Sequence, residues 1–122
     1  MLKTITIILL LMLSVNLIAQ NYEPLNGKWI FKKALNKEVD AAGRKTLKSD
    51  IINKMTFEFK NNNNFTAFAF GQNMSGTWKY SKDLKTISLN VDKEKFEILI
   101  LKLTESEIIL KIGLGEFLMK KI

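Results

Sequence analysis

The sequence contains no histidine and no cysteine. Histidine-based triads, thiol nucleophiles and the common zinc and copper sites are therefore excluded, because each depends on one of these side chains. Disulfides are excluded as well. The fold must therefore be stabilised by its hydrophobic core without covalent cross-links. We expect no bound metal and no cofactor.

The twelve carboxylates are the remaining candidates for catalysis. In principle they could supply an acid–base pair or bind a hard cation. Most of them lie in expected turns or at alternating outward positions, which is typical of solvated surface charge: Asp83, Asp92, Glu94, Glu105 and Glu107. Gly113-x-Gly115 lies between two expected strands with no helix after it, so it does not fit a phosphate-binding loop. We expect no catalytic residues and no enzymatic activity.

The N-terminus has the pattern of a secretory signal peptide. Lys3 gives a basic start, residues 4–13 are apolar apart from two threonines, and Ala19 is a small residue before a cleavage site. A retained membrane anchor is the alternative, but residues 4–19 contain Asn16 and fall short of the roughly 20 apolar residues that a spanning helix needs. We expect cleavage after residue 19, no stable membrane anchor, and export to the periplasm or the exterior.

Residues 20–122 then form a single domain with a moderate positive charge. Without Lys3, 18 basic residues remain against 12 acidic ones, a net charge of +6. The lysines are spread along the chain, as on the solvated face of a sheet, so we expect no nucleic-acid partner. One functional hypothesis, which ranks behind the two given at the end of this section, is that the protein binds an acidic polymer through Lys79, Lys111, Lys120 and Lys121.

Short alternating segments separated by turn residues predict an all-β fold. Residues 55–60 (MTFEFK) alternate strictly, and strand starts from residue 55 onward fall 8 to 12 residues apart. Short connections favour antiparallel neighbours. We therefore predict a small eight-stranded antiparallel up-and-down β-barrel with strands at residues 27–35, 55–60, 65–70, 76–81, 86–91, 95–103, 107–112 and 116–121.

The exception is the polar segment 36–54, which follows the first strand. Ser49 or Asp50 could cap one short helical turn that places Ile51 and Ile52 against the barrel. A connection this long in a compact domain is usually functional or mobile. We interpret it as a possible lid over one end of the barrel.

The facing of two hairpins can be argued from their turns. A two-residue turn at Lys82-Asp83 places Trp78 opposite Ile87, with Tyr80, Leu89 and Val91 on the same face. The hairpin around residues 61–64 stays open. A two-residue turn puts Phe68 and Phe70 in the interior, whereas a three-residue turn with a bulge puts Phe65, Ala67 and Ala69 there.

Two Gly-x-Trp steps, Gly27-x-Trp29 and Gly76-x-Trp78, open strands where a glycine permits a sharp bend or a close backbone approach. Together with Leu25, Phe59-x5-Phe65, Ile87-x-Leu89 and Ile100-x-x-Leu103-Thr104, they make residues 25–122 resemble the small bacterial lipocalin-like domains. The resemblance implies a barrel closed at one end by Trp29, with Lys120 or Lys121 over its ring. The chain is shorter than typical lipocalins, so any cavity should be shallow.

The leading functional hypothesis is a secreted or periplasmic lipocalin-like protein that binds a small apolar ligand. The candidate pocket residues are Phe57, Phe59, Phe68, Phe70, Trp78 and Tyr80, with the Tyr80 hydroxyl or Lys33 as the polar contact. Gly27, Trp29 and Gly76 are assigned structural roles. For each ring, simple core packing is the alternative. The alternative function is a protein-interaction module, an inhibitor or envelope assembly factor, that exposes Leu99, Leu101 and Leu103 outside a filled core.

Overall fold

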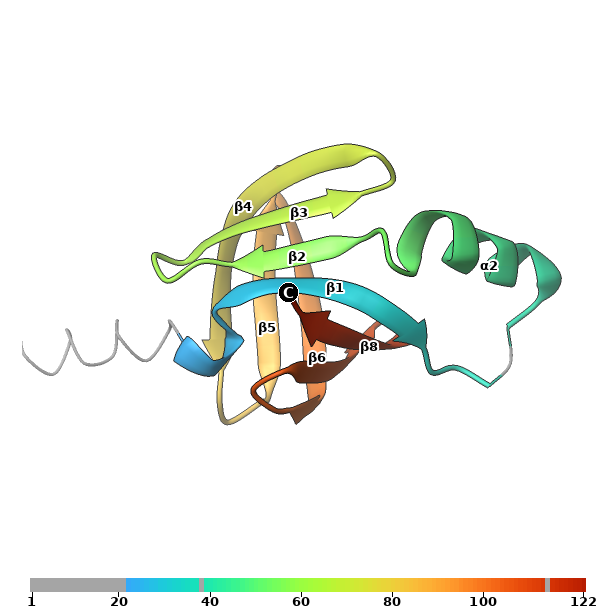
Figure 1. Cartoon of the computed structure of the whole chain (residues 1–122). Helices are drawn as coiled ribbons and strands as arrows, with labels where there is room; N and C mark the ends of the chain where they lie inside the picture. Colours follow the sequence, from blue (N-terminus) through green and yellow to red (C-terminus); the bar gives the residue numbers. More distant parts are fainter. Residues whose placement is uncertain (1–21, 38, 114) are drawn as a thin grey trace, which may run out of the picture.

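Eight antiparallel strands close into a barrel in sequence order (Figure 1). The computed structural model describes residues 22–37, 39–113 and 115–122, so the expected signal peptide, residues 1–19, lies outside the described residues. The predicted fold class is confirmed. The strands are β1 (Gly27–Ala34), β2 (Thr56–Phe59), β3 (Asn64–Ala69), β4 (Gln72–Ser81), β5 (Thr86–Val91), β6 (Glu94–Leu103), β7 (Glu107–Ile112) and β8 (Gly115–Lys121).

Closure of the barrel joins β1 to β8, with Trp29 opposite Lys121 and Phe31 opposite Met119. The pairing shifts between Phe31 and Lys33 in β1, and again between Ile100 and Lys102 in β6. Bulges of this kind bend a strand and increase its twist. These two bends let a short sheet curl round and meet its own first strand.

The β2–β3 hairpin adopts the second of the two alternatives. Phe59 pairs with Phe65 and Phe57 with Ala67, across a three-residue loop in which Asn63 has a φ of 66°. A left-handed third residue is the usual form of such a loop. The expectation that Phe68 and Phe70 line the interior is therefore wrong, because their side chains are 39% and 61% exposed.

The β4–β5 hairpin corrects a predicted register. Trp78 lies opposite Leu89, and Tyr80 opposite Ile87, so the turn spans residues 82–85 instead of Lys82-Asp83 alone. A shift of two residues leaves every side chain on its predicted face, because strand side chains alternate with a period of two. Trp78, Ile87 and Leu89 are accordingly all buried.

The β3–β4 hairpin is tighter than predicted. Residues 72–75, expected as loop, belong to β4, and only Phe70 and Gly71 form the turn, with φ of 53° and 75°. Two successive left-handed residues match the type I′ turn that connects antiparallel strands. Glycine adopts this conformation freely, whereas a phenylalanine at the first position is strained.

Replacing Phe70 with asparagine is expected to stabilise the protein. Relief of the left-handed strain contributes about 1 kcal/mol, and little packing is lost because the ring is 61% exposed. The midpoint of urea unfolding should rise. Phe68→Asn is the matched control and should lower the midpoint, because residue 68 is an ordinary strand position where asparagine is disfavoured. A lower midpoint for Phe70→Asn would show instead that the Phe70 ring holds the hairpin in place.

Aromatic rings fill much of the barrel interior. Phe31 and Phe57 meet edge to face with centroids 5.0 Å apart, Phe57 and Phe65 at 5.2 Å, and Phe59 and Trp78 at 5.3 Å. Edge-to-face pairs at these distances are favourable beyond their buried area. An eight-stranded barrel is just wide enough for such side chains to fill it. The interior is therefore a packed core around these rings.

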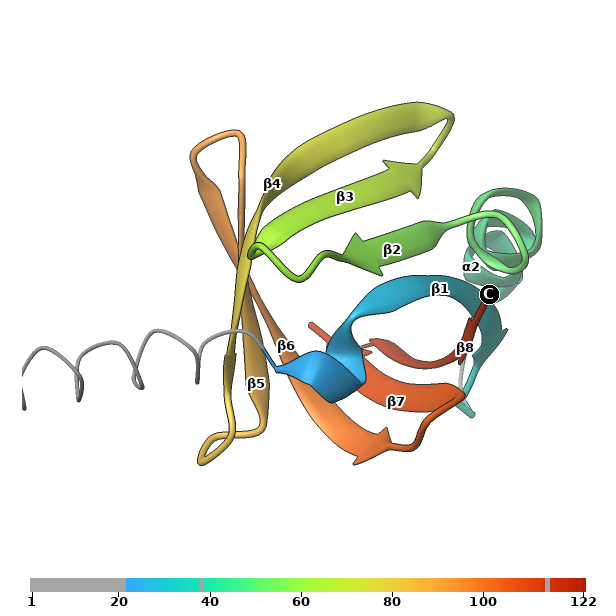
Figure 2. The ribbon, with the colours of Figure 1, turned by 60° about the vertical axis from the view of Figure 1, so that its left-hand side comes forward.

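One end of the barrel is closed by the 3₁₀ turn Glu23–Leu25, which precedes β1 (Figure 2). Leu25 is fully buried, and its carbonyl accepts a hydrogen bond of 3.0 Å from Trp29 Nε1. Lys121 Nζ lies 5.3 Å from the centroid of the Trp29 ring, so the cation–π contact implied by the family resemblance is present and is made by Lys121. Gly27 has a φ of 132°, which L side chains rarely adopt.

The opposite end carries the helix α2 (Ala41–Thr46), followed by the π-helical turn Leu47–Ile51 (Figure 1). Asp40 caps the helix, since its Oδ1 accepts a 2.7 Å hydrogen bond from Gly43 N. The prediction that Ser49 or Asp50 is the cap is wrong, because both lie inside the π-helical turn. None of the residues of α2 is buried, and the helix stands beside the ends of β1 and β2. Among the described residues, no helix is both long and apolar enough to cross a bilayer.

Candidate functional site

Three of the predicted pocket residues belong to the packed core. Phe57, Phe59 and Trp78 are 7%, 0% and 0% exposed. Trp78 Nε1 donates a 2.9 Å hydrogen bond to the carbonyl of Lys60, so the polar edge of the indole is already satisfied by the β2–β3 turn. These side chains contact one another and line none of the hollows described below.

The other predicted site residues are scattered. Tyr80 is half-buried and stacks on Tyr22, with ring centroids 4.7 Å apart and 25° between the planes. Burial raises the pKa of the Tyr80 phenol, and the neighbouring Tyr22 adds to the rise. Lys33 is exposed and lies opposite Leu118 of β8. Because Phe68 and Phe70 are also on the surface, the structure does not bring the predicted residues into one pocket.

The end of the barrel opposite Trp29 has an apolar, half-exposed rim. Phe96 lies directly opposite Leu89, which is 4% exposed, and residues directly opposite each other share a face of the sheet. Phe96 thus faces the interior side, yet its side chain is 44% exposed. Further partly buried apolar residues at this end pack against the core: Ile51, Met55, Met74, Ile112 and Phe117. This end of the barrel is therefore open.

Two hollows flank α2 at this open end. The first has a volume of about 410 Å³ and the second about 440 Å³. They share an apolar wall made of Ala34, Val39 and Leu47. Ile52 adds to the apolar lining of the first hollow, and Phe117 to that of the second. Both volumes lie in the range of roughly 300–1,000 Å³ that is typical of small-molecule pockets.

The spacing of residues on the helix explains which side chains enter the hollows. Gly43 and Leu47 lie four residues apart on one side of the helical segment, and Val39, which precedes the cap, lies against Gly43 on the same side. Arg44 and Lys48 form a second row with the same spacing, and both line the first hollow. The segment therefore presents an apolar row and a basic row side by side at the open end.

Both ends of this segment are tied to the barrel by hydrogen bonds. Asn36 Oδ1 accepts from the backbone N–H of Glu116 at 2.7 Å, and Leu35 N donates to the Glu116 carbonyl at 2.8 Å. At the other end, Asn53 N donates to the Phe31 carbonyl at 2.7 Å. These bonds fix the base of the helical segment against β8 and β1. The walls of the two hollows are thus held in place at both ends.

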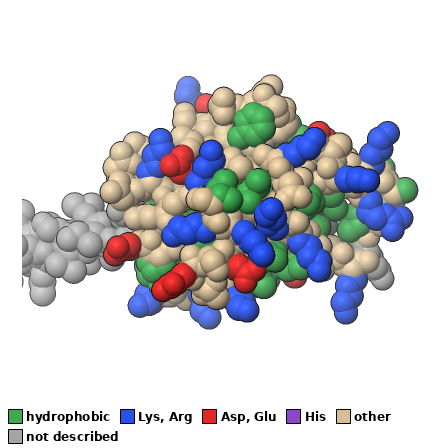
Figure 3. All heavy atoms as spheres, viewed as in Figure 1, with side chains coloured by type: hydrophobic (Ala, Val, Ile, Leu, Met, Phe, Trp, Pro, Cys, Tyr) green, Lys and Arg blue, Asp and Glu red, His purple; other side chains and the backbone are tan. Residues whose placement is uncertain are grey.

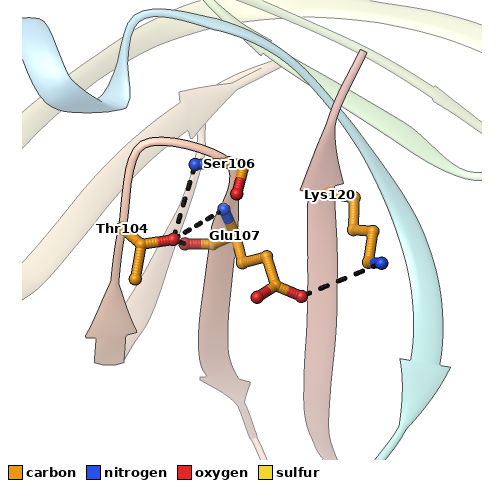
Figure 4. A network of polar contacts seen from close by, with 4 residues as sticks. All are labelled: Thr104, Ser106, Glu107 and Lys120. Carbon is orange, nitrogen blue, oxygen red and sulfur yellow. Dashed lines mark hydrogen bonds and ion pairs between the residues drawn. The ribbon is translucent and has the colours of Figure 1, made fainter.

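A separate polar network at the β6–β7 turn is structural (Figure 4). Thr104 Oγ1 accepts hydrogen bonds from the backbone N–H groups of Ser106, at 3.4 Å, and Glu107, at 3.0 Å. Lys120 Nζ and Glu107 Oε2 form an exposed ion pair at 4.0 Å, a kind that contributes little to stability. The described residues contain no group of three or more His, Cys, Asp and Glu side chains arranged to hold a metal ion.

The closed eight-stranded antiparallel barrel with one short helix after its first strand defines a protein of the lipocalin-like class. The model of the lipocalin-like domain family matches residues 25–110, and the chain belongs to this family. The match covers both Gly-x-Trp steps and most of the strands. No curated protein matches the chain.

Solved structures from Bacteroides share the fold. An uncharacterized protein from Bacteroides eggerthii has a TM-score of 0.61 at 12% identity, over 80% of this chain and 99% of that chain. A lipocalin-like protein from Bacteroides uniformis has a TM-score of 0.60 at 16% identity, over 81% and 99%. A second protein from Bacteroides uniformis has a TM-score of 0.55 at 20% identity, over 84% and 94%. These similarities concern the fold alone.

Proposed function

We propose that this protein is an exported, non-enzymatic binding protein that takes up a small apolar ligand at the open end of its barrel. The observation that carries the proposal is the half-exposed apolar rim, with Phe96 facing the interior side at 44% exposure. Ile98 and Ile100, which follow Phe96 on the same face of β6, are both buried in the core. The two hollows beside α2 lie at the same end of the barrel, and Phe117, which packs against the core, lines the second of them.

The ligand would lie in a shallow position, because the rings of Phe31, Phe57 and Phe59 fill the barrel beneath the rim. Leu47 and Phe117 would cover it from the helix and from β8. Burial of apolar surface is the driving force, worth about 25 cal/mol for each Å² removed from water. The proposal includes no metal, cofactor or nucleic acid. Export is supported by the signal-peptide pattern of residues 1–19.

A titration with 1-decanol, a neutral single-chain probe, tests the proposal. We expect saturable binding by calorimetry, and Leu47→Gln should weaken it about tenfold, because one lost apolar contact costs on the order of 1–3 kcal/mol. Leu101→Gln is the matched control, since Leu101 is 47% exposed on the outer side of β6. Absence of saturable binding would contradict the proposal.

A second candidate function is protein interaction through the outer face of β6. The observation in its favour is the exposure of Leu99 and Leu101, at 39% and 47%, beside the bulge between Ile100 and Lys102. Leu103 is partly buried against the core and contributes less to this surface. Light scattering tests this candidate: self-association that Leu101→Gln abolishes and Leu47→Gln leaves intact would favour the outer face, whereas a monomer would count against pairing of two copies through it.

A further inference from the structure

The first hollow beside α2 has an uneven charge. Lys37, Arg44 and Lys48 line it, and its described lining residues include no carboxylate. All three side chains are exposed, and within the described part of the chain no ion pair engages any of them. Basic side chains gather over the end of the molecule that carries α2 (Figure 3). The hollow therefore places unpaired positive charge beside an apolar wall.

The surrounding sequence does not neutralise this charge. Residues 32–54 contain seven basic residues and three acidic ones. Asp40, one of the three, accepts the capping hydrogen bond from Gly43 N, so its carboxylate faces the helix N-terminus. A bound anion would relieve the mutual repulsion of Lys37, Arg44 and Lys48. Arg44 can offer a carboxylate two parallel hydrogen bonds.

Charge and shape together define the ligand. We propose that the first hollow binds the anionic headgroup of a single-chain amphiphile, with Arg44 and Lys48 as the contacts of the headgroup. The chain of the amphiphile lies on Ile52 and on Leu47, part of the wall that the two hollows share, and extends toward Phe117 in the second hollow. This inference rests on the proposed function and specifies its ligand class as a carboxylate-headed, single-chain molecule.

The shape of the hollow favours a single molecule over a membrane surface. Leu47 and Ile52 are partly buried walls of a concavity of about 410 Å³. A flat lipid surface would need apolar side chains that protrude, because they must reach the acyl region past the headgroups. One headgroup with part of its chain fits a concavity of this size. Adsorption to an anionic membrane is therefore an alternative outcome of the test.

The test compares three probes with the same chain: decanoate, 1-decanol and decyltrimethylammonium. We expect decanoate to bind about tenfold more tightly than decanol, as one charge-assisted contact allows, and the cationic probe to bind more weakly than decanol. The variant R44Q/K48Q should lower decanoate affinity to that of decanol and leave decanol affinity unchanged. The control K79Q/K111Q removes two exposed lysines elsewhere on the barrel and should retain the decanoate preference.

Each other outcome has a definite meaning. Equal affinities for decanoate and decanol overturn the inference and leave the proposed function standing, whereas binding of neither probe overturns both. An equal loss of decanoate affinity in K79Q/K111Q and R44Q/K48Q would assign the preference to net charge and overturn the assignment to this hollow. Binding to vesicles of phosphatidylglycerol without binding of decanoate overturns it in favour of membrane adsorption. Raising the salt concentration should reduce the decanoate preference alone.

Discussion

Replacing Gly76 with alanine is expected to destabilise the protein by about 3 kcal/mol or more, since overpacking of this kind reaches the upper end of its usual range when the clash is with backbone. A Cβ atom at residue 76 would lie 1.9 Å from the carbonyl oxygen of Asn90 and 3.1 Å from Cα of Val91. Gly76 is paired on both sides, with Val91 in β5 and with Phe65 in β3. Neither neighbour can withdraw without opening the barrel.

Gly71→Ala is the matched control for this substitution. Gly71 has a φ of 75° and nothing within 4 Å of an added Cβ, so only left-handed strain opposes the alanine. Its expected cost is about 1 kcal/mol. Thermal unfolding followed by circular dichroism compares the two variants. Equal losses would show that the close approach to Asn90 is not the reason for glycine at residue 76.

The predicted strands were accurate because alternation of apolar and polar residues directly reports a half-buried strand. The predicted turn lengths were less accurate. A change in turn length has a different effect on side-chain facing in the two hairpins. The β4–β5 turn is two residues longer than predicted, yet Trp78 and Leu89 stay on their predicted face. In the β2–β3 hairpin a change of one residue decides whether Phe68 or Ala67 faces the core. Runs of asparagine allow either turn, so the sequence left this facing open.

The helical segment was also predicted only in part from the sequence. Asp40, Ser49 and Asp50 are all acceptable cap residues, and the prediction of Ser49 or Asp50 as the cap is wrong because Asp40 caps the helix. Asp40 directly before Ala41 and Ala42, two strong helix formers, was the signal that could have located the start of the helix. What this signal could not supply is the position of the helix. That depends on contacts such as Asn36 Oδ1 with Glu116 N, which are 80 residues apart in the chain.

The candidate site was located only in part. Interpreting segment 36–54 as a possible lid pointed to the end of the barrel where the hollows lie. The aromatic residues assigned to a pocket lie elsewhere, because rings as large as those of Phe57 and Trp78 fill a barrel of eight strands. The cations of the first hollow were missed, since lysines spread along a strand-rich chain give no sign of which ones a helix will gather.

Replacing Trp78 with alanine is expected to cost about 3–5 kcal/mol, the usual loss for a buried aromatic ring. The ring is fully buried against Phe59, and Nε1 donates to the Lys60 carbonyl at 2.9 Å. The backbone of Trp78 also holds the β2–β3 loop, with hydrogen bonds to Asn63 O at 2.9 Å and from Asn63 Nδ2 at 3.1 Å. A domain of this size is stable by only about 5–15 kcal/mol, so Trp78→Ala should be marginally folded.

Trp78→Phe separates a structural role from a role in binding. Phenylalanine keeps most of the apolar packing and loses the hydrogen bond to Lys60, so we expect a smaller loss of about 1–3 kcal/mol in the free energy of unfolding. Trp29 remains as the fluorescent reporter of unfolding. Affinity for decanol should be unchanged in the folded variant, because Trp78 lies in the core beneath the rim. A loss of decanol affinity with little loss of stability would contradict this assignment and make Trp78 a wall of the binding site.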